Sequence, residues 1–232
     1  MMPHAYLATL ALITVMPLIS AIVRWRFAWA KHDWLRLLQV FALVSVPFVL
    51  LDSLSHARGW WAYNPDFVMG VRLLGLPVEE IMFFFVVPFA CLYLYSAMQR
   101  AAPDVPFRRA WLWRGVIGLA VVAGIILAII EPKERTIFDA VLFAVVGTVA
   151  MFRRPTRTTA IWLLLVLGLF LVVNTVLTAL PIVAYDATFG SMYRIGTIPF
   201  EDALYNLSFL LLSLGVWNAE PVKKLLQAAH RS

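Results

Sequence analysis

The chain alternates between long apolar runs and short polar connections. A helix needs about 20 apolar residues to cross a lipid bilayer, and seven runs have nearly this length or more. They cover residues 5–23, 34–51, 77–98, 112–130, 137–152, 159–180 and 199–218. The fifth run is short and carries Asp139 near its start. The pattern predicts an all-α integral membrane protein with seven transmembrane helices.

Two of these runs open with the same polar motif. Residues 72–80 read RLLGLPVEE at the start of the third run, and residues 194–202 read RIGTIPFED at the start of the seventh. The offset of 122 residues also maps Asp52 onto Asn174, Tyr63 onto Tyr185 and Phe83 onto Tyr205. We therefore predict two parallel three-helix repeats, at 1–100 and 136–232. Three helices alone would leave the second repeat inverted relative to the first. A linking fourth helix within 101–135 gives both repeats the same direction, so that both motifs converge in a single membrane domain.

The distribution of charge predicts the orientation. The net charge is +6, but the basic residues are scattered between apolar runs, so we expect no nucleic-acid partner. Of the 19 Lys and Arg residues, 14 lie in the C-terminal tail, in the connections after runs one, three and five, or within the first three residues of the run that follows such a connection. Cytoplasmic connections of membrane proteins are enriched in Lys and Arg. The N-terminus is therefore predicted outside, the C-terminus in the cytoplasm, and both motifs at the non-cytoplasmic face.

The acid pair of each motif is the candidate for chemistry. A proline suits the first helical turn, which places the carboxyl groups in the first turns of their helices, at the edge of the hydrocarbon. Ionisable groups at such positions are usually functional. The helix N-terminus favours the charged form, whereas desolvation and a neighbouring carboxylate favour the protonated form of a general acid. The candidate catalytic residues are Glu79, Glu80, Glu201 and Asp202.

Aromatic residues surround the two motifs. Aromatic faces stabilise cations, so an acid beside them suits carbocation chemistry on an apolar alkene. Asp52 and Asn174 end their helices at matched positions, where they either cap a connection or line the site. Arg72 and Arg194 either anchor the acids through salt bridges or tune them, and Asp139, which has no repeat partner, is expected to be structural. The aromatic candidates for substrate contact are Phe83, Phe84, Tyr205, Trp61, Tyr63 and Tyr185.

Four stretches carry a family resemblance: Pro77–Glu80 followed by Phe83-Phe84, Pro199–Asp202 followed by Tyr205, Trp61–Pro65, and Asn174-Thr175. At these stretches the chain resembles the small integral-membrane lycopene cyclases of microbes, in the form that fuses two short subunits. The resemblance implies that a terminal double bond of the carotenoid is protonated at C2. The C5–C6 double bond then captures the C1 cation, and loss of a C6 proton gives a β ring. One acid of the first motif would donate the proton. An acid of the second would be the base or orient it, unless the proton returns to the same carboxylate.

The resemblance also implies the partners. The substrate would be lycopene or a related linear carotenoid within a lipid bilayer, and its conversion would involve no net redox chemistry. Other enzymes of carotenoid synthesis are candidate partners. The sequence contains no Gly-rich dinucleotide fingerprint, so we expect no flavin or other cofactor. The histidines never cluster at ligand spacing and Cys91 is the single cysteine, so we expect no metal. The alternative is a small membrane transporter, since some of these also contain parallel three-helix repeats.

Overall fold

The computed structural model describes residues 5–23, 31–191 and 193–219, and in this part the fold is all-α. Each apolar run predicted from the sequence is helical. A π-helical turn at Phe41–Ser45 joins α2 to α3, so these two helices form one rod. The helices are α1 (Ala5–Val23), α2 (Lys31–Val40), α3 (Val46–Ala57), α4 (Val78–Ala101), α5 (Ala110–Ile130), α6 (Glu134–Phe152), α7 (Arg157–Ala179) and α8 (Phe200–Trp217).

Five of the described helical segments are long and apolar enough to cross a membrane: Asp33–Ala57, α4, α5, α6 and α7. Their outer faces carry large exposed apolar side chains, among them Leu119, Ile129 and Leu164. Apolar surface on this scale is costly in water and favourable in lipid. Helix α3 continues to Ala57, six residues beyond the predicted end of the apolar run, and its last turns include the polar residues Asp52 and Ser55.

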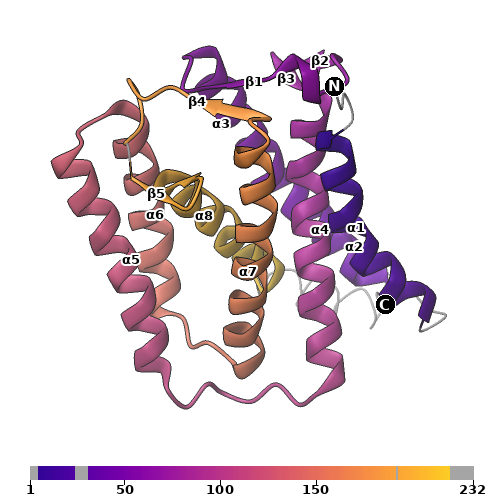
Figure 1. The fold of residues 1–232 in the computed structure, drawn as a ribbon. Helices are drawn as coiled ribbons and strands as arrows, with labels where there is room; N and C mark the ends of the chain where they lie inside the picture. Colours follow the sequence, from indigo (N-terminus) through magenta and orange to yellow (C-terminus); the bar gives the residue numbers. More distant parts are fainter. Residues whose placement is uncertain (1–4, 24–30, 192, 220–232) are drawn as a thin grey trace.

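Short strands connect the helices at one end of the bundle (Figure 1). β1 (Trp61–Tyr63) pairs antiparallel with β4 (Val183–Tyr185), which places Trp61 opposite Tyr185. This ladder ties the α3–α4 connection to the α7–α8 connection. The α4–α5 and α6–α7 connections lie at the opposite end (Figure 1). Strands of three residues are too short to produce the period-two pattern that identifies a strand in a sequence.

Each acid motif folds as a hairpin that leads directly into a helix. β2 (Arg72–Leu73) pairs with β3 (Leu76–Pro77), and β5 (Arg194–Ile195) pairs with β6 (Ile198–Pro199). The tight first turn needs positive φ at Leu74 (54°) and Gly75 (81°), as in a type I′ turn. Helix α4 begins directly after β3, and α8 directly after β6. Both acid pairs therefore lie in the first turn of a helix, as predicted.

Helix α8 occupies the interior of the bundle. It packs against α2, α4, α5 and α6, whereas α1 packs against α4 and α7. Its buried residues include Glu201, Asn206 and Ser208 among larger apolar side chains. The second acid motif is thus held at the centre of the protein, next to the first turn of α4.

Candidate active site

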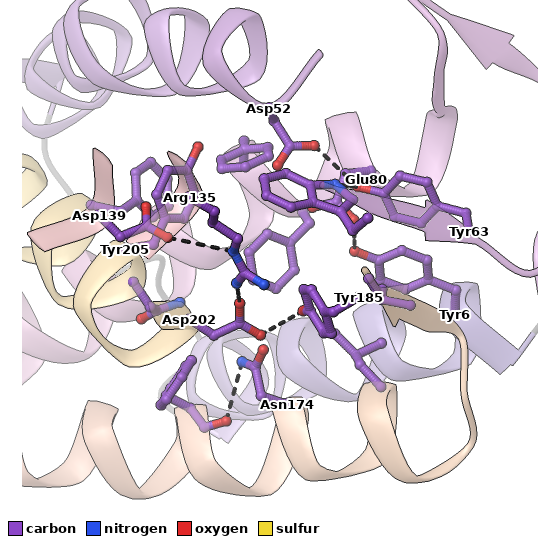
Figure 2. Close-up of a pocket in the computed structure, with 18 residues that line it drawn as sticks. Tyr6, Asp52, Tyr63, Glu80, Arg135, Asp139, Asn174, Tyr185, Asp202 and Tyr205 are labelled. Carbon is purple, nitrogen blue, oxygen red and sulfur yellow. Dashed lines mark hydrogen bonds and ion pairs between the residues drawn. The ribbon is translucent and has the colours of Figure 1, made fainter. Parts of the chain in front are cut away.

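A cavity of about 70 Å³ lies between the first turns of α4 and α8. Residues from α1, α3, β1, α6, α7 and β4 complete its wall (Figure 2). Ten of the fourteen candidate residues line it: Asp52, Trp61, Tyr63, Glu80, Phe83, Phe84, Asn174, Tyr185, Asp202 and Tyr205. The structure therefore brings together residues that are up to 153 positions apart in the chain, from Asp52 to Tyr205.

One side of the cavity holds two carboxyl groups with phenol partners. The Tyr6 hydroxyl donates to Glu80 Oε2 over 2.5 Å. The Tyr63 hydroxyl donates to Asp52 Oδ2 over 3.1 Å, and Trp61 Nε1 donates to the Tyr63 oxygen. Within residues 5–23, 31–191 and 193–219, no Lys or Arg forms an ion pair with Glu80 or Asp52. Burial and the nearby Asp52 carboxyl raise the pKa of the Tyr63 phenol, which therefore remains a neutral donor.

The other side of the cavity holds a charged cluster around Arg135. Its guanidinium pairs with Asp202, and its Nε lies 3.5 Å from Asp139 Oδ2. The Tyr185 hydroxyl donates to Asp202 Oδ2 over 2.5 Å, and burial beside this carboxyl raises the pKa of the Tyr185 phenol. Figure 2 shows Arg135 between the two carboxylates. The cluster contains two acids and one cation.

Arg135 also changes the expected role of two aromatic residues. Its guanidinium carbon lies 4.4 Å from the centre of the Tyr185 ring and 5.3 Å from that of Trp61. These two rings therefore make their cation–π contact with Arg135, a residue of the protein, and not with a substrate cation. Phe83, Phe84 and Tyr205 have no such cation over them in the part of the chain that the structure describes, and they remain the aromatic wall available to a bound cation.

The two acids of each motif occupy different environments. Glu79 and Glu201 are fully buried but do not line the cavity. Glu79 Oε1 accepts from the backbone N–H of Met69 and Glu201 Oε1 from that of Ser191, each over 2.6 Å. These donors are themselves 122 positions apart. Consecutive residues on a helix point about 100° apart, so one acid of each motif faces the cavity and the other holds the preceding connection to the helix.

Arg72 and Arg194 lie away from the cavity, which corrects the position expected for them. Both side chains are exposed, and each donates to a carbonyl of its own hairpin, Gly75 at 3.0 Å and Thr197 at 2.8 Å. The short hairpin directs each arginine back toward its own turn. In the described structure neither one forms an ion pair with an acid of its motif.

Sequence reasoning missed four polar residues of the cavity wall: Tyr6, Arg135, Asp139 and Asn206. Arg135 was placed in the connection before the fifth run, but α6 begins at Glu134 and puts Arg135 in its first turn. Asp139, expected to be structural, lines the cavity one turn later. The spacing of Arg135 and Asp139, four residues apart on a helix, is a readable signal. Tyr6 gives no such signal, because it is one aromatic residue within an apolar run.

The sequence model of a family described as lycopene cyclase matches residues 3–98 and 135–219, which contain both motifs and exclude α5. A bifunctional lycopene cyclase/phytoene synthase of Podospora anserina is 32% identical over 66 residues, 27% of this chain and 11% of the relative. A lycopene beta-cyclase of Halobacterium salinarum is 38% identical over 68 residues, 28% of this chain and 26% of the relative. This chain therefore covers about a quarter or less of these curated relatives. No solved structure matches it significantly.

Proposed function

The chain belongs to the lycopene cyclase family, and from this premise we propose that it closes β-type rings at the ends of linear lycopene. The observation that carries the proposal is the cavity itself, which combines an aromatic wall with carboxyl groups that have no cationic partner among the described residues. A proton is added at C2 of the carotenoid and a proton is lost from C6. The reaction is therefore an isomerisation in which no electrons are exchanged.

Glu80 is the proposed general acid. It is buried and faces the cavity, and it and Asp52 each accept a hydrogen bond from a phenol, Tyr6 and Tyr63 respectively. An isolated buried carboxylate is costly, and such a group avoids the cost by holding a proton. A second carboxyl group nearby adds to this preference. The Tyr6 hydroxyl fixes one oxygen of Glu80, which leaves the other oxygen to carry the proton toward the alkene.

The Arg135 cluster is the proposed anionic side of the site. Two carboxylates and one guanidinium carry a net charge of −1, which stabilises a carbocation formed in the cavity. Asp202 lies at the start of α8 and is the candidate that accepts or directs the leaving proton. Because Arg135 is neutralised by its two partners, it does not repel the cation. Phe83, Phe84 and Tyr205 complete the apolar part of the wall.

We further propose seven membrane-spanning helices, arranged as two parallel three-helix repeats at 1–100 and 136–232 with α5 as the link. The equivalent hairpins, and the equivalent bonds from Met69 and Ser191 to the outer acids, support this arrangement. The excess of Lys and Arg in the odd-numbered connections and the tail supports an outside N-terminus and a cytoplasmic C-terminus.

Labelling of single cysteines tests this orientation. Asp66 and Arg108 are exposed and lie in connections at opposite ends of the bundle. In a Cys91→Ser background, Asp66→Cys is expected to react with an impermeant maleimide in intact cells, because its connection is predicted outside. The control variant Arg108→Cys is expected to react only after the membrane is opened. The reverse pattern would contradict the orientation and leave the cavity unaffected.

The proposed activity is tested in washed membranes from cells that express this chain and make no carotenoid. Lycopene added in detergent or vesicles is expected to yield cyclic carotenoid without any added nucleotide, since the reaction has no redox step. The products are separated by chromatography and identified by absorption. If lycopene remains linear when the protein is present and folded, the proposed function is wrong. Activity that depends on added reduced flavin would contradict the cofactor-free mechanism.

A further inference from the structure

A narrow second cavity of about 20 Å³ lies next to the active-site cavity. The two cavities share Phe83, Phe170, Asn174 and Asn206 in their walls, so these side chains stand between them. Beyond the two asparagines its lining is apolar except for the Cys91 thiol, and it follows α4 and α7 toward the interior of the helix bundle. We call it the α4–α7 slot, and its deeper residues are Ile13, Val87, Cys91, Val166, Val173 and Leu210.

The internal repeat predicts an equivalent slot between α8 and α3, but aromatic rings fill that position. The 122-residue offset places Phe209 where the first half has Val87, and Phe84 where the second half has Asn206. The Phe209 ring lies 5.4 Å from that of Phe84 and 4.9 Å from that of Phe48, between ring centres. Phe48 is the equivalent of Phe170. Two substitutions between the halves thus leave one slot open and close its counterpart.

We infer that the α4–α7 slot binds the conjugated chain next to the reacting end of a linear carotenoid. This inference rests on the proposed function. A polyene is apolar and thin, so it gains free energy by burial in such a slot. The inference requires the slot to widen around the polyene, through rotation of the Leu169 and Leu210 side chains in its wall. From Phe83 to Cys91 the slot follows α4 for about 12 Å, which suits one segment of the polyene. Leu169 lies in the slot lining and is exposed on the outer face of α7, which gives the remaining chain a route into lipid.

The slot fixes the direction of the substrate. Asn174 and Asn206 stand at the junction, so the end of the carotenoid lies on the carboxyl side of the asparagines and the polyene on the other. Because aromatic rings fill the equivalent position between α8 and α3, the repeat supplies one open slot of this kind within the described residues. The open slot lies along α4, the helix that also supplies Phe83 and Glu80 to the cavity wall.

Three matched Val→Phe substitutions test the slot. Val87 and Val166 line it and are 8% and 2% exposed, whereas Val172 points outward from α7 and is 60% exposed. Each change is made in a Glu80→Gln background, which is expected to retain unreacted lycopene. The proteins are purified from lycopene-producing cells, and bound lycopene per protein is measured by absorption. Val87→Phe and Val166→Phe are expected to lower it at least tenfold, and Val172→Phe to leave it unchanged.

If all three variants bind the same amount of lycopene, the inference that the slot binds the polyene is wrong. It is also wrong if the Glu80→Gln protein itself contains no bound lycopene. If the protein with Glu80 in place also forms no ring from lycopene, while the slot variants lose bound lycopene, the slot is retained and the cyclase function is rejected.

Discussion

Glu80→Gln is expected to lower ring formation by about 10²–10⁴-fold, the usual contribution of general acid–base catalysis. Glutamine keeps the shape of the side chain and still accepts the hydrogen bond from Tyr6, but it has no acidic proton to give to C2. Lycopene should therefore accumulate without cyclic product in cells that make it. The measurement is cyclic carotenoid per amount of protein in the membrane, so that loss of protein is not counted as loss of activity.

The neighbouring acid provides a matched control. Glu79→Gln makes the same chemical change one residue earlier on the same helix, at a side chain that faces away from the cavity. Its amide oxygen can still accept from the backbone N–H of Met69, so most of the activity should remain. Equal loss in both variants would mean that the connection held by Glu79 is as important as the acid. Full activity of Glu80→Gln would move the acid role to Asp52, the other carboxyl group on that side, and Asp52→Asn would then test it.

The contrast between these two glutamates shows how far the sequence alone leads. Runs of apolar residues predict the helices, and the repeated motif predicts that both acid pairs begin a helix. The rotation of each helix about its axis depends on contacts with its neighbours, and α4 is apolar on nearly all sides, so its sequence does not indicate which acid faces inward. The structure decides this through the Met69 and Ser191 amides, which bind the outer acids.

Other parts of the site depend on contacts between helices that sequence patterns do not report. Tyr6 meets Glu80 across 74 positions of the chain. The position equivalent to the slot is filled by the rings of Phe48, Phe84 and Phe209, which come from three different helices. Arg72 and Arg194 drew attention because they repeat, yet their repetition reflects the two hairpins that they stabilise. Arg135, which does contact the acids, has no counterpart under the 122-residue offset, where Ile13 stands.

Arg135→Met should cause the largest loss of stability among single changes at the site. Arg135 is almost completely buried, and it neutralises Asp139 and Asp202 while covering the Tyr185 ring. Removing one partner of a buried ion pair leaves uncompensated charge, which typically costs about 3–5 kcal/mol. The expected result is a melting temperature in detergent lower by about 10 °C or more. Arg194→Met is the matched control, and because Arg194 is exposed it should change the melting temperature little.

A compensating change separates the two functions of the arginine. In the triple variant Arg135→Met, Asp139→Asn, Asp202→Asn, no buried charge remains in the cluster, so most of the lost stability should return. Ring formation should stay low, because the net negative charge that faces the cation is gone together with the Asp202 carboxylate. Arg135→Lys keeps the charge but loses the planar fork that reaches both carboxylates, so it should fall between the wild-type chain and Arg135→Met in melting temperature. Recovery of ring formation in the triple variant would show that the cluster serves only to hold α6 and α8 together, and the anionic side of the mechanism would then have to be abandoned.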